Sequence, residues 1–206
     1  GTGRLSIPLI KSGARYNGLD ASKNFCFFHK EKLKANNLIG KVYQKNMQNF
    51  YINEKFDVIF IAFNSFLHNY SDQEAIQCLR SAKKHLNPKG KFILDILMPN
   101  PLSLYRPKNV RLEVMEFIDP ESSDLIKIKE TVNYNVETEI IDINWYFINE
   151  IKNLEKTYSF SMRMFFPSKI NDLLQKSKFK IKNIWGDYNK SKFTENSEKQ
   201  IYECII

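Results

Sequence analysis

The sequence predicts an α/β fold in which a doubly wound, mostly parallel sheet carries an antiparallel β insert. Residues 1–101 alternate short apolar or β-branched runs with stretches of helical period, which is typical of βαβ units on a parallel sheet. Residues 110–164 form long segments of alternating β-branched and aromatic residues, which is typical of antiparallel strands. With 206 residues, 43% of them hydrophobic, we expect one domain over residues 1–206. Its parts are a parallel core (1–101), the insert (102–165) and a closing helix with strands (166–206).

Apolar periodicity divides the parallel core into elements. Residues 56–63 (FDVIFIAF) form a nearly continuous apolar run, as a strand covered on both faces requires. Residues 72–86 carry an apolar stripe of helical period, and the following Asn87-Pro88-Lys89-Gly90 predicts a break before a strand at 91–97. The other predicted core elements are helices at 4–12 and 21–36 and strands at 15–20 and 41–46.

The chain after the insert returns to the core. Residues 167–177 place Ile170, Leu173 and Leu174 on one helical face, and strands are expected at 179–185 and 200–206. No internal repeat, Pro-rich stretch or low-complexity linker divides the chain. The insert is therefore expected to belong to the same domain as the core.

Composition narrows the function classes. The net charge of +8 raises the question of nucleic acid, but 25 of the 31 basic residues are Lys, scattered through every segment. Recognition surfaces favour the bidentate fork of Arg, so a solvated surface is favoured over an RNA-binding patch. No long apolar run or secretory signal is present, and we expect a cytoplasmic protein that binds no membrane. Cys26, Cys78 and Cys204 are odd in number and far apart, which indicates reduced, mostly buried thiols and no metal site.

Two glycine-containing segments indicate a ligand site. Gly1-Thr2-Gly3 opens a predicted helix, and Gly18-Leu19-Asp20 ends the strand that follows. A glycine turn lets a ligand approach backbone amides at a helix start, and an acid about 20 residues further on can accept hydrogen bonds from ribose hydroxyls. The spacing predicts a nucleoside-containing ligand, and nicotinamide and flavin enzymes share this arrangement.

The order of motifs resembles that of the class I S-adenosylmethionine-dependent methyltransferases, particularly the aminosugar N-methyltransferase-like branch. The matching segments are GTGRLSIPL, GLDAS, NMQNF before FDVIFIAFNSFLHN, LNPKGKFILDILMPN and, near the end, WGDY. The resemblance implies a Rossmann-like sheet with an antiparallel last strand, a core that binds S-adenosyl-L-methionine, and an insert that covers the substrate side. The family's first strand would precede Gly1. Its absence here leads us to expect a chain truncated at its N-terminus.

The resemblance also assigns cofactor contacts. Gly1 and Gly3 would lie beside the methionine moiety, and Asp20 would hold the ribose hydroxyls, with Ala21 and Ser22 nearby. Four further residues complete the predicted cofactor site: Asn46 and Met47 would frame the adenine, and Phe63 and Asn64 would lie beneath the cofactor. Asn46 stands where the family usually has Asp, and its side-chain oxygen can still accept from the adenine amino group.

Candidates for catalysis and substrate binding follow from the expected chemistry. An in-line methyl displacement mainly needs alignment and exclusion of water. His68 is the nearest candidate base, with a packing or capping role as the alternative. Candidate substrate contacts are Ser65, Tyr146, Arg163 and Tyr188, together with Trp145, with core packing as the alternative for the aromatic residues. Asp95 is either a substrate contact or the cap of the next turn.

These features predict methyl transfer from S-adenosylmethionine to a nitrogen or oxygen of a small molecule. A homodimer is compatible with this prediction. The alternatives are a catalytically silent methyltransferase-like binding protein, suggested by Asn46 and the missing strand, and an RNA methyltransferase, suggested only by the charge. A nicotinamide-linked oxidoreductase fits the closing strands and the FNSFLHN segment poorly.

Overall fold

The N-terminal part of the chain forms a small parallel sheet with two helices. The computed structural model describes all of residues 1–206. Its first elements are α1 (Ser6–Lys11), β1 (Asn17–Asp20), α2 (Lys23–Ala35) and β2 (Lys41–Gln44). Strands β1 and β2 pair in parallel, so that Asp20 at the end of β1 lies beside Gln44. Helix α2 begins where the Ser22 hydroxyl accepts a hydrogen bond of 3.2 Å from the Phe25 amide.

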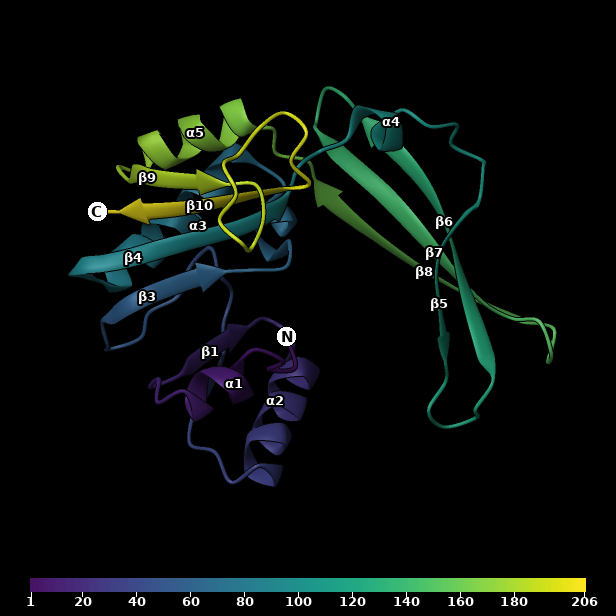
Figure 1. Cartoon of the computed structure of the whole chain (residues 1–206), viewed down its shortest axis with the longest axis horizontal. Helices are drawn as coiled ribbons and strands as arrows, with labels where there is room; N and C mark the ends of the chain where they lie inside the picture. Colours follow the sequence, from purple (N-terminus) through teal and green to yellow (C-terminus); the bar gives the residue numbers. More distant parts are fainter.

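A four-stranded sheet forms the centre of the molecule (Figure 1). Its strands are β3 (Phe56–Ile61), β4 (Leu86–Leu97), β9 (Lys180–Trp185) and β10 (Lys199–Ile205), in the order β3-β4-β10-β9. Strand β3 runs parallel to β4, whereas β10 runs antiparallel to both of its neighbours. The mostly parallel core with an antiparallel last strand is thereby confirmed.

The helices that cover this sheet carry the expected apolar faces. They are η1 (Ser65–His68), α3 (Asp72–His85) and α5 (Pro167–Lys176). Ala75, Cys78 and Leu79 of α3 and Leu173 of α5 are almost completely buried and join Leu94 of β4 in the main core. All three cysteines are free and buried, as predicted. Burial raises the pKa of Cys78 and of Cys204 to about 12, so both remain protonated thiols.

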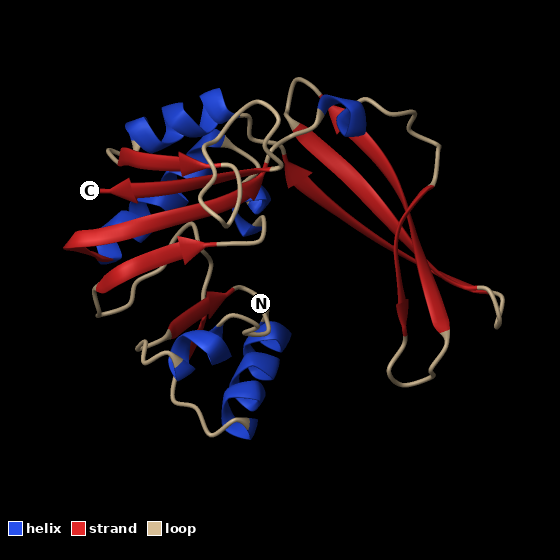
Figure 2. Cartoon of the chain, viewed as in Figure 1, coloured by secondary structure: helices blue, strands red, loops and turns tan.

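The insert is a separate antiparallel sheet that extends away from the central sheet (Figure 2). Its strands, in the order β5-β6-β7-β8, are β5 (Leu112–Ile118), β6 (Leu125–Asn135), β7 (Ile140–Asn149) and β8 (Leu154–Arg163). A short helix α4 (Pro101–Leu104) precedes it. Val132, Ile141 and Ile143, at the base of this sheet, belong to the main core, so the insert and the α/β part share one apolar interior. No helix of the structure is long and apolar enough to cross a membrane.

Two local predictions were wrong, and two short helices were not predicted. Strand β4 begins at Leu86 and runs through the Asn-Pro-Lys-Gly segment, with a shift in its pairing to β3 between Phe56 and Val58. A Cβ atom at Gly90 would lie 3.0 Å from the Phe56 carbonyl oxygen, so glycine allows the two strands to approach closely here instead of turning apart. Strand β3 is not covered on both faces, because Val58 and Phe60, which lie on the same face of the strand, are 52% and 38% exposed. The strand also lies at the edge of its sheet. The short helices η1 and α4 were not predicted, since one turn carries too little periodicity to be recognised.

Candidate cofactor and substrate site

The glycine turn is shaped by a buried histidine beneath it. Gly3 has φ +78°, and a Cβ atom there would lie 2.2 Å from Cδ2 of His29. A Cβ atom at Gly18 would lie 2.8 Å from Cε1 of the same ring. His29 is 3% exposed, and burial lowers its pKa below the ordinary value. Only glycine fits at position 3, because both the backbone conformation and the space exclude a side chain.

Asp20 is held at the mouth of this turn. One carboxylate oxygen accepts a hydrogen bond of 2.8 Å from the Ser22 amide, and the other contacts the amino group of Gly1. The side chain retains 24% of its exposure. A carboxylate offers about four lone-pair sites, so Asp20 can accept further hydrogen bonds from a ligand.

The end of β3 has an unusual backbone. Phe63 and Asn64 both adopt left-handed conformations, with φ values of 52° and 63°. Phe63 donates its amide hydrogen to Asp95 at 3.2 Å, and the Asn64 side-chain oxygen accepts from the Leu97 amide at 2.7 Å. Such conformations cost about 1–3 kcal/mol each and persist where the surroundings enforce them. Strand β4 therefore fixes the turn that exposes the Phe63 ring.

A chain of side-chain contacts links the two sheets at this edge. The guanidinium carbon of Arg4 lies 4.2 Å from the centre of the Phe63 ring. Tyr188, in the loop between β9 and β10, donates its hydroxyl hydrogen to the buried Asp95 at 2.9 Å. Burial and the Asp95 hydrogen bond raise the pKa of Tyr188, which keeps the phenol protonated. The glycine turn, the ends of β3 and β4, and the Tyr188 loop thus meet at the carboxyl ends of the parallel strands, where open α/β sheets bind ligands.

The loop after β2 carries Asn46 and Met47. The Asn46 side-chain oxygen accepts from the Gln48 amide at 3.1 Å, which leaves one lone pair for another donor. Buried Asn69 donates to the Met47 sulfur at 3.8 Å, and its oxygen accepts from the Gln48 side chain at 2.8 Å. Asn69 therefore fastens this loop to the end of η1.

Ser65 and His68 lie on η1, directly after the Phe63 turn. The Ser65 hydroxyl donates to the Ala62 carbonyl at 3.0 Å. His68 is exposed, and its Nδ1 lies 3.5 Å from the Tyr70 hydroxyl, which donates to the Ser161 carbonyl at 3.1 Å. The chain of contacts from His68 ends on β8, so the histidine faces the junction between core and insert.

Tyr146 and Arg163 have their hydrogen-bond and cation–π partners outside this cluster. Tyr146 is stacked under Arg111 at 3.6 Å on the insert sheet. Trp145 precedes it on β7 and points to the opposite face, donating to Glu130 at 2.7 Å, so these two candidate substrate contacts lie on different faces of the insert. Arg163 is 6% exposed and binds Asp72 and Glu139, each at 2.6 Å. These hydrogen bonds join β8 to the start of α3 and to the β6–β7 turn.

Sequence reasoning passed over three residues of the site. Arg4 follows the glycine turn, and its position beside Phe63 has no local signal. His29 is one of only three histidines. It lies three residues after Cys26 and four before Leu33, on the same face of α2, which could have indicated that it points inward. Asn69 is fully buried, but nothing in its neighbours predicts that.

Comparisons with known proteins agree with this geometry. Residues 1–90 match the family model described as a methyltransferase domain. The chain is 20% identical over 207 residues to the putative methyltransferase YqeM of Bacillus subtilis, covering 99% of this chain and 80% of that protein. It superimposes with a TM-score of 0.81 on an S-adenosylmethionine-dependent methyltransferase from Clostridium acetobutylicum, at 17% identity, covering 100% of this chain and 80% of the other. For CalS10, an amino pentose methyltransferase from Micromonospora echinaspora solved with S-adenosylmethionine bound, the TM-score is 0.75 at 12% identity, with the same coverage. Residues 1–90 are thus similar to a methyltransferase domain, and the chain as a whole shares the fold of these solved S-adenosylmethionine-dependent methyltransferases.

Proposed function

We propose that this protein binds S-adenosyl-L-methionine at the carboxyl edge of its parallel strands and transfers the methyl group to a nitrogen or oxygen of a small molecule. The observation that carries the proposal is the meeting of the Gly3 turn, Asp20, the exposed Phe63 ring and Tyr188 at that edge. The amino pentose methyltransferase among the structural relatives supports a small, amine-bearing acceptor.

The residues present fit this cofactor. Asp20 keeps free lone pairs for the two ribose hydroxyls, and Asn46 keeps one for the adenine amino group. Gly1 has open space around its α-carbon, and the tight Gly3 turn lets a ligand approach the backbone closely. Met47, Phe63 and Asn64 supply the remaining contacts in the proposal. When bound, the cofactor supplies a methyl group activated by a sulfonium.

The chain's own contribution to the reaction is alignment and proton acceptance. Tyr188 is 60% exposed and oriented by Asp95, so its ring can position an acceptor beside Phe63. Ser65 and the exposed His68 border the same edge from η1. We assign to His68 Nε2 the proton released by an attacking amine or hydroxyl, because Nδ1 is the atom nearest the Tyr70 hydroxyl.

Calorimetric titration with S-adenosylhomocysteine tests cofactor binding by the chain of residues 1–206. Asp20→Ala should weaken binding about 10- to 100-fold, because hydrogen bonds to a charged group contribute about 1.5–3 kcal/mol. Asp57→Ala is the matched control, since Asp57 is an exposed acid at the start of β3, away from the site. Asp20→Asn, which retains an acceptor for the Ser22 amide, separates loss of binding from loss of folding. Absence of binding by the wild-type protein would contradict the proposal and favour a silent binding protein.

Transfer of a labelled methyl group identifies the acceptor class. Aminosugars, small hydroxylated compounds and RNA are offered in parallel. We expect label in an amine or hydroxyl compound, with a lower kcat for His68→Ala because that variant lacks the proton acceptor. Label in RNA alone would contradict the small-molecule proposal.

A further inference from the structure

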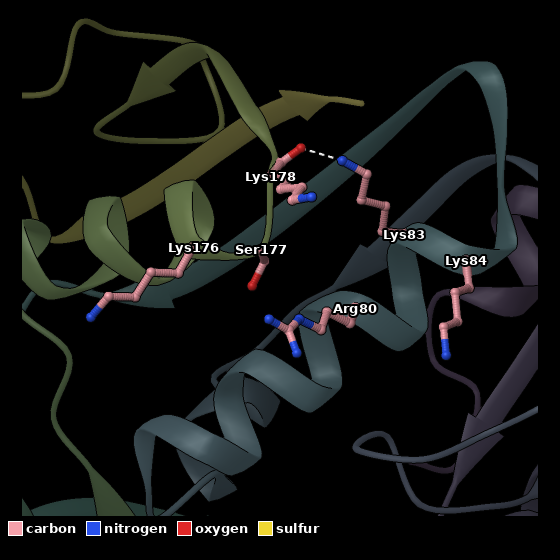
Figure 3. A pocket seen from close by; sticks show the side chains of 6 residues that line it. All are labelled: Arg80, Lys83, Lys84, Lys176, Ser177 and Lys178. Carbon is pink, nitrogen blue, oxygen red and sulfur yellow. Dashed lines mark hydrogen bonds between the residues drawn. The ribbon is translucent and has the colours of Figure 1, made fainter.

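A basic pocket lies at the edge of the central sheet opposite the candidate site. Its volume is about 350 Å³, and it lies between the end of α3 and the end of α5 (Figure 3). Helix α3 ends directly before β4 begins, and Lys178 stands two residues before β9, so the pocket borders the amino ends of these strands. Phe63 and Asp95 belong to the carboxyl ends. The lining residues are Arg80, Lys83 and Lys84 from α3, and Lys176, Ser177 and Lys178 from the end of α5.

The pocket concentrates positive charge with little compensation. Five of its six lining residues are cationic, and no carboxylate lines it. Lys176 has an ion pair with Asp172 at 2.7 Å. The Lys83 ammonium donates to the Lys178 carbonyl, a hydrogen bond drawn in Figure 3. Burial lowers the pKa of Lys83, and the charges of Lys178 and Lys180 lower it further, as expected where cations crowd without an anion.

Ser177 provides an independent sign of a ligand. The residue is 2% exposed, lines the pocket, and its hydroxyl oxygen has no hydrogen-bond partner. In Figure 3 its side chain points toward Arg80, into the space between the two helices. A buried hydroxyl left unpaired loses its hydrogen bonds to water without replacement and is destabilising. An anion seated between Ser177 and the cations would satisfy it.

Helix stabilisation explains only part of the cluster. Cations in the last turn of a helix interact favourably with its dipole, and this covers Lys83, Lys84 and Lys176. Arg80 stands a turn before the end of α3, and Lys178 lies beyond α5 with φ 59°. Neither these two cations nor the unpaired Ser177 hydroxyl is needed to end the helices.

We propose that this pocket binds the phosphate groups of a polyphosphate, either free or as part of a nucleoside triphosphate. Several closely spaced cations and a hydroxyl donor match the many charged oxygens of linked phosphates. No apolar or aromatic residue lines the pocket, so it offers a base no surface to stack on. Recognition therefore rests on the phosphates.

Titration of sodium tripolyphosphate into the chain of residues 1–206 at low salt tests the proposal. Arg80→Gln combined with Lys178→Gly should weaken binding at least tenfold, and glycine suits the left-handed backbone at position 178. Lys30→Gln with Lys34→Gln removes the same charge from exposed positions of α2 and should leave the affinity within about twofold. Equal losses of affinity in the two double variants would overturn the proposal, because attraction of the anion to the net positive charge of the protein would then explain binding.

Two further arms sharpen the result. Ser177→Ala should weaken tripolyphosphate about 3- to 10-fold without lowering Tm, whereas a purely structural serine would change Tm and leave the affinity unchanged. ATP that binds as tightly as tripolyphosphate indicates recognition of phosphates alone, and tighter ATP binding indicates a nucleotide. If an RNA oligonucleotide binds and neither tripolyphosphate nor ATP does, the proposal is overturned in favour of an RNA-binding site. The affinity for S-adenosylhomocysteine should not change in the Arg80/Lys178 variant, which separates this pocket from the proposed cofactor site.

Discussion

At the scale of single residues, the turn that opens the candidate site depends on the absence of one side chain. Gly3→Ala would place a methyl group 2.2 Å from the His29 ring on a backbone with φ +78°. We expect a loss of about 1–3 kcal/mol in unfolding free energy, from overpacking and strain, together with weaker binding of S-adenosylhomocysteine. Urea denaturation and calorimetry measure the two effects.

The control for this substitution is Gly1→Ala, since no atom lies within 4 Å of a Cβ built at Gly1. That variant should keep the wild-type stability. The cost of Gly3→Ala should be smaller when His29 is also changed to Ala, because the clashing ring is gone. Equal costs in the two backgrounds would show that the backbone conformation alone requires glycine.

At the scale of elements, Arg163 joins the last insert strand to the core. Its guanidinium binds Asp72 at the start of α3 and Glu139 in the β6–β7 turn, with only 7% of the side chain exposed. Burial raises the pKa of Asp72, but the hydrogen bond and charge of Arg163, with Lys169, outweigh it and hold the pKa below its ordinary value. Arg163→Met leaves two carboxylates facing each other and should cost about 2 kcal/mol, because both acids remain partly exposed.

An exposed pair on the same sheet supplies the comparison for Arg163. Arg111 binds Glu155 at 2.8 Å with both side chains about two-fifths exposed, so Arg111→Met should lower the free energy of unfolding much less than Arg163→Met does. Denaturant unfolding measures both variants. Similar losses of unfolding free energy in the two variants would mean that the buried ion pairs of Arg163 stabilise the protein no more than the exposed pair of Arg111 does.

At the scale of the whole molecule, we expect the free energy of unfolding to decrease in acid, because protonation removes the charge of carboxylates that are stabilised by hydrogen bonds and ion pairs in the folded protein. The hydrogen bonds from Lys91 and Asn183 lower the pKa of Glu203 below 4.5. A lowered folded-state pKa stabilises the protein above the unfolded value, and that contribution is lost as the pH falls through the folded value. Glu203→Gln should therefore lower Tm by about 2–4 °C at pH 7, with the difference vanishing toward pH 3.

Thermal unfolding between about pH 7 and pH 3 follows this difference. Glu195→Gln is the reference, because Glu195 is exposed and forms no ion pair. Its Tm should follow the wild type at every pH. A Glu203→Gln difference that is constant with pH would show that packing, and not the charge, is what the substitution removes.

Local patterns determined much of this protein. The periodicity of α3, the apolar run of β3 and the alternation in the insert predicted the element types. The glycine turn, with Asp20 seventeen residues after Gly3, predicted a nucleoside site. The order of motifs then indicated the fold, which the comparisons confirm. These features could be predicted because each depends on residues that lie close together in the sequence.

Contacts between distant segments were decided only by the tertiary structure. Tyr188 and Asp95 are 93 residues apart, and Arg163 and Asp72 are 91 apart. Which face of β7 carries Trp145, and whether Arg163 meets a ligand or two carboxylates, depends on how the insert packs on the core. Such pairings leave no local signal, because the free energy that selects them comes from burying apolar surface shared by several elements. The types of the elements therefore follow from the sequence, whereas the partners of the side chains at the site follow from the packing.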